Sequence, residues 1–281
     1  EDGADGLLIV CPSLVADAKM RVINADGSEA SMCGNGLRCV ARYVCEKLQV
    51  SEALIETMKA NLKVKKEQPL FKQLPTYSVE ISPVSFALSS LPMWYKNQEA
   101  ILNEVIEAFS PTIQFTAVSV PNPHLIGIVN DYYIKHQSHQ FLLAQYLNNE
   151  NEYCADGVNV SYVYPMTDDS IYVRTYERGV GFTNACGTAM TASALVANLN
   201  GIVKSNIVTV YNPGGFVKCV IDKEDSGYKL LLIGNATIKQ LYSLKVIDDS
   251  FEWIHCESTG EQVEYEECIK FVEQQINPYL K

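Results

Sequence analysis

The sequence lacks the features that mark nucleic-acid-binding and membrane proteins. Its 22 lysines and arginines are outnumbered by 33 aspartates and glutamates, which gives a formal net charge of −11. Nucleic acids and anionic membrane surfaces require clustered basic side chains, so we expect neither as a partner. No apolar run in the sequence has the length needed to span a bilayer.

Motifs for metals and cofactors are also missing. There are nine cysteines, an odd number at irregular spacing, and no two of them form a CxxC pair, so a structural zinc site is not expected. The sequence contains neither a nucleotide-binding fingerprint nor a lysine motif for pyridoxal phosphate, so we expect neither a metal nor a cofactor. A chain of 281 residues can bury a core without disulfides, so most thiols should be reduced, which indicates the cytoplasm.

The hydrophobic pattern predicts an α/β (α+β) protein. Strands are expected at 7–10, 19–23, 53–57, 77–81, 116–119, 125–129, 158–163, 171–175, 207–210, 216–220 and 228–233. Helices are expected at 37–48, 101–109, 140–147, 189–199 and 261–280. The polar, proline-containing stretch 89–97 is interpreted as a linker.

Two segments resemble each other and indicate an internal duplication. Residues 24–36 (NADGSEASMCGNG) and residues 177–189 (ERGVGFTNACGTA) each follow a strand, pass through a polar glycine-containing loop and reach Cys-Gly at the start of a helix. This pattern predicts two α/β units related by a pseudo-two-fold axis, with Cys33 and Cys186 facing one another.

A pair of thiols in this setting fits one reaction in particular. Backbone N–H groups at a helix start favour the thiolate, so both cysteines are expected to have lowered pKa values. Inverting an amino-acid centre requires one acid/base group on each face of Cα, and helix N-termini can hold the substrate carboxylate and stabilise the carbanion. The sequence therefore predicts a two-thiol epimerase or racemase.

The two cysteine segments resemble the two signatures of diaminopimelate epimerase, and 121–124 (PNPH) and 157–160 (GVNV) resemble that family's asparagine-bearing segments. The resemblance implies interconversion of LL- and meso-2,6-diaminopimelate in lysine and peptidoglycan precursor synthesis. Cys33 would be the proton donor and Cys186 the proton acceptor, with His124 and Glu177 tuning the site. The residues expected to bind substrate are Asn24, Gly34, Asn35, Asn122, Asn159, Glu177, Arg178, Gly187 and Thr188.

The family fold implies two similar domains, each a β-sheet or barrel wrapped around a central helix, with the active site in the cleft between them. Residues 1–88 would form the N-terminal domain, with 238–281 as a candidate completion, and 89–237 the C-terminal domain. The resemblance also implies that the family's N-terminal segment is missing from the start of this sequence. A homodimer is also implied by the resemblance.

Some residues depart from the family pattern and leave alternatives open. Gly6 stands where many members have Gln, Phe182 and Ala189 replace residues that are often Glu and Gly, and the acidic tail exceeds the usual length. One alternative is a racemase of another amino acid such as histidine, although Arg178 suits a side-chain carboxylate. A second is a thiol-redox switch that forms a Cys33–Cys186 disulfide.

Overall fold

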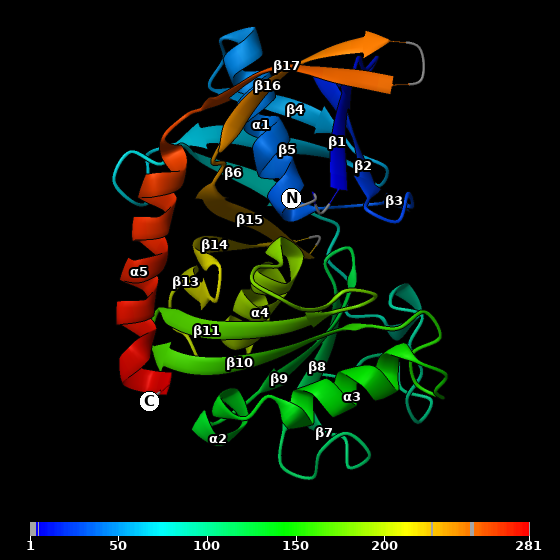
Figure 1. The fold of residues 1–281 in the computed structure, drawn as a ribbon. Coiled ribbons are helices and arrows are strands. Elements are labelled where there is room, and N and C mark those ends of the chain that lie inside the picture. The colour runs from blue at the N-terminus through cyan, green and yellow to red at the C-terminus, as the bar shows by residue number, and fades with distance from the viewer. Residues whose placement is uncertain (1–3, 5, 226, 248–249, 281) are drawn as a thin grey trace.

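The computed structural model describes residues 4, 6–225, 227–247 and 250–280 (Figure 1). The strands are β1 (Gly6–Cys11), β2 (Ala18–Asn24), β3 (Glu29–Ala30), β4 (Glu52–Glu56), β5 (Asn61–Glu67), β6 (Thr76–Ile81), β7 (Glu104–Val105), β8 (Gln114–Ser119), β9 (Pro123–Ile128), β10 (Asn159–Thr167), β11 (Ser170–Glu177), β12 (Gly181–Thr183), β13 (Ile207–Asn212), β14 (Gly215–Glu224), β15 (Gly227–Asn235), β16 (Gln240–Ile247) and β17 (Ser250–Ser258). The helices are α1 (Gly34–Leu48), α2 (Asp131–Lys135), α3 (Ser138–Asn148), α4 (Gly187–Leu199) and α5 (Glu261–Leu280), with a 3-10 turn at Leu88–Ser90.

One large sheet bends around two helices, which confirms the mixed α/β class. Its strand order is β1-β2-β4-β5-β6-β15-β14-β13-β11-β10-β9-β8-β7, with β3 paired to β2 and β12 paired to β11. The first strands of this order surround α1 and the later ones surround α4 (Figure 1). The last strands of the two halves, β6 and β15, pair antiparallel and join the halves into one sheet.

The strand pairing repeats in the two halves, in agreement with the duplication expected from the cysteine segments. In the first half β1 pairs antiparallel with β2, β3 folds back on β2, and α1 crosses over to β4, which lies parallel to β2. In the second half β10, β11, β12, α4 and β13 have the same relations in the same order. The domain boundaries at 88/89 and 237/238 stay a prediction.

The sequences of the two central helices explain their positions. Helix α1 buries an apolar stripe that includes Leu37, Ala41 and Val44, and it ends where Gln49 adopts a left-handed conformation. Helix α4 is built from small and aliphatic residues and is buried on all sides from Gly187 to Ala197. Both helices therefore lie inside the sheet, and their buried side chains share one continuous hydrophobic cluster.

A second cluster fills the other face of the second half and overturns two sequence predictions. The expected helix at 101–109 does not form, because Ile101, Ile106 and Phe109 turn into this cluster while Glu104–Val105 pairs with β8. The stretch 89–97 is not a linker, because Leu91, Met93 and Tyr95 are buried in the same cluster. In both segments tertiary packing decides a conformation that the local pattern does not.

The tail forms the expected helix α5, preceded by the β16–β17 hairpin, which the pattern did not reveal. Near its start, Glu261 accepts two hydrogen bonds from Arg42 of α1 at 2.7 and 2.8 Å. Near its end, Tyr279 contacts Tyr164 of β10 at a ring separation of 6.4 Å. Helix α5 thus runs along both halves of the molecule (Figure 1).

Candidate active site

Cys33 and Cys186 occupy equivalent places, as the N-cap residues of α1 and α4. Both have extended backbone conformations, and the Cys33 sulfur accepts a hydrogen bond from the Gly36 N–H at 3.3 Å. The Cys186 sulfur lies 3.6 Å from Oγ1 of Thr188, the second residue of α4. Each thiol is therefore held at the positive end of a helix, as the two Cys-Gly sequences predict.

The two helix starts abut, and glycine makes this possible. A Cβ placed on Gly34 would lie 3.4 Å from the Gly187 Cα, and a Cβ on Gly187 would lie 3.2 Å from the Asn35 nitrogen and 2.9 Å from Cδ2 of Leu232. Asn35 also spans the contact, because its Nδ2 donates to the carbonyl oxygen of Ala185 at 3.0 Å. The structure thus brings together two loops that are far apart in the sequence.

The expectation that both thiols have lowered pKa values is wrong for the structure as it stands. Burial raises the pKa of Cys33, opposed by the Gly36 N–H and the Arg38 guanidinium, and the Glu177 carboxylate adds to the rise. Burial also raises the pKa of Cys186, again with Glu177 contributing. The sequence shows the helix starts but not the desolvation, which disfavours the charged form more strongly than the N–H groups favour it.

Glu177 and Arg178 lie at the end of β11, and neighbouring side chains hold both. Oε1 of Glu177 accepts a hydrogen bond from Thr183 Oγ1 at 2.5 Å. The Arg178 N–H donates to Oδ1 of the buried Asn159 at 2.8 Å, and its Nη1 donates to the carbonyl oxygen of Asp156 at 2.7 Å. The carboxylate acts electrostatically on both thiols, so it belongs to the same site.

His124 lies on β9 directly beside Asn159 of the parallel strand β10. Its ring is fully buried, and neither ring nitrogen has a hydrogen-bond partner among the residues that the structure describes. Burial, with a smaller effect from Arg178, lowers the pKa of His124 to about 3. The imidazole is therefore neutral near physiological pH, and it can act on a neighbour as a neutral donor or acceptor but not as a cation.

The other predicted residues have different surroundings. Asn24 is exposed, and its Nδ2 donates to Ser28 Oγ at 2.9 Å within a turn. Asn122 is half-buried just before β9, where its carbonyl oxygen accepts a hydrogen bond from Val120 N–H at 3.0 Å. Gly34, Gly187 and Thr188 are buried at the two helix starts.

The structure also shows the surroundings of the three residues that depart from the family pattern. A Cβ on Gly6 would lie 2.4 Å from the Ile23 carbonyl oxygen, so this backbone accepts only glycine there. Phe182 packs against Tyr176 and lies 5.7 Å from the Arg174 guanidinium, within an aromatic cluster. Ala189 is fully buried in the first turn of α4.

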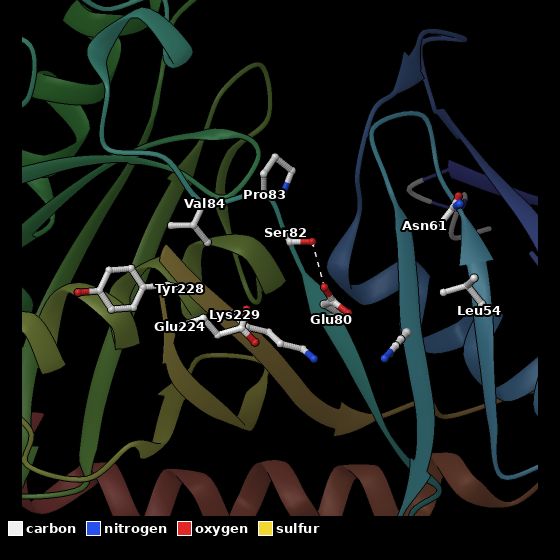
Figure 2. Close-up of a pocket in the computed structure, with 10 residues that line it drawn as sticks. Leu54, Asn61, Glu80, Ser82, Pro83, Val84, Glu224, Tyr228 and Lys229 are labelled. Atoms are coloured by element: carbon white, nitrogen blue, oxygen red, sulfur yellow. Dashed lines mark hydrogen bonds between the residues drawn. The ribbon is translucent and has the colours of Figure 1, made fainter. Parts of the chain in front are cut away.

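A cavity of about 440 Å³ lies elsewhere, between β4–β6 and the β14–β15 hairpin (Figure 2). It is lined by Leu54, Asn61, Lys63, Glu80, Ser82, Pro83, Val84, Glu224, Tyr228 and Lys229. None of the predicted site residues lines it. Among the residues that the structure describes, no group of three or more His, Cys, Asp or Glu side chains is placed to hold a metal ion, and no helix is long and apolar enough to cross a membrane.

Comparison with known proteins decides the family. Residues 2–71 and 116–239 match the family described as diaminopimelate epimerase. The chain is 50% identical over 276 residues to the diaminopimelate epimerase of Listeria monocytogenes, with 97% of this chain and 83% of the relative covered. It is 47% identical over 280 residues to that of Enterococcus faecalis, covering 97% and 85%. The chain belongs to the diaminopimelate epimerase family.

The fold of this diaminopimelate epimerase family member also resembles solved structures of low sequence identity. A hydroxyproline epimerase from Agrobacterium vitis superposes with a TM-score of 0.56 at 14% identity, covering 82% of this chain and 71% of the other. A PhzF-family phenazine biosynthesis protein from Bacillus anthracis gives 0.55 at 13%, covering 82% and 81%. At this level of identity the likeness concerns the fold alone.

Sequence reasoning missed two residues at the site of this diaminopimelate epimerase family member. Thr183 donates a hydrogen bond to Glu177, and the charge of Arg38 opposes the rise in the pKa of Cys33. Thr183 lies within the second signature segment, 177–189, and Arg38 lies two residues after the end of the first, 24–36. Arg38 is also a charged residue among the buried residues of α1. Because arginine is rarely buried unless it is paired, its place in this apolar stripe was a signal of a specific role.

Proposed function

We propose that this chain interconverts LL- and meso-2,6-diaminopimelate without a cofactor, using Cys33 and Cys186 as its two acid/base groups. The observation that carries the proposal is the contact between the two Cys-Gly helix starts. It places one thiol at each of two abutting N-termini, with the Glu177 carboxylate acting on both. The names of the close relatives supply the substrate.

In the proposed reaction one sulfur, as thiolate, removes the α-hydrogen as a proton, and the other, as thiol, donates its proton to the opposite face of the carbanion. In the direction assigned from the resemblance Cys186 accepts and Cys33 donates, and the reverse reaction exchanges these roles. The backbone N–H groups of Gly34, Asn35 and Gly187 lie at the helix starts, where they suit the α-carboxylate and stabilise the charge that develops next to it.

Arg178 is the proposed partner of the distal carboxylate. Arg178 is exposed, and its guanidinium has further N–H donors besides the Nη1 group that binds the Asp156 carbonyl oxygen. The buried Asn159 fixes the backbone at Arg178 and would therefore set the direction of this contact. Asn24 and Asn122 remain proposed contacts to other polar groups of the substrate.

Deuterium incorporation at Cα in D₂O tests the proposal, with diaminopimelate compared against a panel that includes histidine. We expect exchange and epimerisation with diaminopimelate, and loss of turnover in Cys33→Ser and in Cys186→Ser under reducing conditions. Cys39→Ser is the matched control, because this exposed thiol lies on the same helix α1 but not at its start.

Two results would contradict parts of the proposal. Exchange with another amino acid but not with diaminopimelate would overturn the substrate. Full turnover in Cys33→Ser would overturn the two-thiol mechanism and favour a redox role for the pair.

The setting proposed for the enzyme is lysine and peptidoglycan precursor synthesis in the cytoplasm, where a reducing environment suits nine free thiols. A homodimer is proposed from the family resemblance. Sedimentation of the purified chain at several concentrations tests it.

A further inference from the structure

Arg38 is a buried cation on the helix that follows Cys33. We call the two helix starts the cysteine corners: the Cys33 corner is Cys33–Asn35 and the Cys186 corner is Cys186–Thr188. Arg38 is 6% exposed, and it lies on α1 five residues after Cys33. In the described ranges no salt bridge joins it to a carboxylate. Its Nε donates to the carbonyl oxygen of Asn235 at 3.0 Å, and its Nη1 donates to Oδ1 of Asn35 at 3.1 Å. Burying a guanidinium is costly, so these contacts require an explanation.

The surrounding backbone makes room for this side chain. A Cβ on Gly234 would lie 3.1 Å from Nε and 3.2 Å from Cζ of Arg38. Glycine at the end of β15 therefore lets the guanidinium lie flat against the strand and reach the Asn235 carbonyl. Arg38 is thereby tied to the strand that joins the two halves of the sheet.

Asn35 continues the connection to the second corner. Its Oδ1 accepts from Arg38, while its Nδ2 donates to the carbonyl oxygen of Ala185, the residue before Cys186. Because both ends of the amide are engaged, its orientation is fixed. The same Oδ1 would lie 3.1 Å from a Cβ on Gly187, so the amide fills the space between the two helix starts.

We propose that Arg38 and Asn35 form a hydrogen-bonded relay, from the carbonyl oxygen of Asn235 to that of Ala185, which sets the position of the Cys186 corner relative to Cys33. Both are positioning residues for the two-thiol reaction. This inference rests on the proposed function. It assigns the Asn35 side chain to the protein, whereas the sequence resemblance assigns Asn35 to the substrate; the backbone N–H of Asn35 remains available for that purpose.

Besides its geometric role, Arg38 affects the ionisation of Cys33. The Arg38 guanidinium binds Asn35, which stands only two residues after Cys33, and its positive charge favours the thiolate of that cysteine. Lysine keeps this charge but loses the fork that binds two acceptors at once, whereas methionine loses the charge and keeps much of the volume. The two substitutions therefore separate geometry from charge.

Steady-state kinetics of Asn35→Ala test the geometric part. Two thiols must stand on opposite faces of one carbon, and a displacement of about 1 Å can cost roughly 10²-fold in rate. We expect kcat to fall to that extent while KM changes less than threefold, because no substrate contact is removed. A raised KM with unchanged kcat would make the side chain a substrate contact and overturn the relay, as would wild-type kinetics.

The pH dependence of Cys33 alkylation by iodoacetamide, followed by peptide mass spectrometry, tests the charge. In Arg38→Met the profile should move to higher pH, whereas in Arg38→Lys it should stay near that of the wild type although kcat falls. Arg42→Lys is the matched control, because Arg42 lies one turn further along α1 and binds Glu261 and Glu46 instead. It should change neither kcat nor the profile.

The alkylation measurement requires no turnover, so it separates failure of the relay from failure of the proposed function. If the wild type does not epimerise diaminopimelate but Arg38→Met still moves the Cys33 profile, the proposed substrate is wrong and the charge effect stands. An unchanged profile in a folded Arg38→Met would overturn the charge effect. If Arg38→Met does not fold, Arg38→Lys and Asn35→Ala still decide the geometric part, since wild-type kcat in either contradicts it.

Discussion

The contact between the two helix starts leads to a graded prediction for Gly187→Ala and Gly34→Ala. A Cβ on Gly187 would lie 2.9 Å from Cδ2 of Leu232, 3.1 Å from Oδ1 of Asn35 and 3.2 Å from the Asn35 backbone nitrogen. The Leu232 methyl can move, but the Asn35 backbone belongs to the first turn of α1. The added methyl group therefore has to push the two corners apart.

Overpacking of this kind costs about 1–3 kcal/mol. Alanine regains part of this through its higher helix propensity, up to about 1 kcal/mol, and less at a helix start. We expect a net loss of about 1–2 kcal/mol for Gly187→Ala, which corresponds to a fall in Tm of roughly 2–8 °C for a protein of this size. Because the thiols move with the corners, kcat should fall roughly 10²-fold.

Gly34→Ala is the matched comparison. Its Cβ would approach the Leu232 methyl at 3.1 Å but the backbone of Gly187 only at 3.4 and 3.5 Å, which is ordinary van der Waals contact. Its Tm should therefore lie close to that of the wild type, and its kcat should fall less than that of Gly187→Ala. Calorimetry and the deuterium assay measure both quantities. Equal Tm values for Gly187→Ala and the wild type would refute the packing of the two corners described above.

Three further predictions concern other parts of the site and the tail. Because Arg42 lowers the pKa of Glu261 through their hydrogen bonds, this carboxylate stabilises the fold above its unfolded pKa and the stabilisation is lost as pH falls through the lowered pKa. Glu261→Gln should therefore reduce the free energy of unfolding at neutral pH by about 1 kcal/mol and weaken its decline in acid, as urea titrations at several pH values would show. The buried His124, with its pKa lowered to about 3, should show no NMR titration of its ring through the range in which an ordinary histidine titrates. It should contribute to acid unfolding, because the unfolded state binds the proton first as pH falls; a His124 titration near pH 6.5 would contradict its burial. Asn159→Ala removes the acceptor of the Arg178 N–H, and it should destabilise the protein by about 1–2 kcal/mol and raise KM for diaminopimelate more than it lowers kcat; an unchanged KM would separate Arg178 from substrate binding.

The sequence predicted those features that short segments encode by themselves. Each Cys-Gly pair carries its own helix start, and the apolar stripe of α1 and the small residues of α4 mark two buried helices. The repetition of one pattern around Cys33 and Cys186 was sufficient to predict the duplicated topology, because each half repeats the same order of strand, strand, hairpin return and crossover helix.

Features that depend on distant partners could not be predicted in this way. Ile101–Phe109 has helical spacing, but Ile101 binds β8 through its carbonyl oxygen, which accepts from Ala117 N–H. The β16–β17 hairpin escaped notice because β16 is exposed along its whole length and shows no burial pattern. The direction of the thiol pKa shifts depends on desolvation. The role of Arg38 depends on its hydrogen bonds to the Asn235 carbonyl oxygen and to Asn35, which in turn binds the Ala185 carbonyl oxygen.

The pairing of β6 with β15 bears on how such a duplicated protein can be divided. Six residue pairs, from Thr76–Asn235 to Ile81–Leu230, hold this seam together in the middle of the sheet. A half produced alone would display one of these strands as an open edge flanked by apolar side chains such as Val79 or Leu232, and such edges recruit other chains. Separately expressed halves should therefore aggregate, but when co-expressed they should find each other through this seam and reconstitute both cysteine corners.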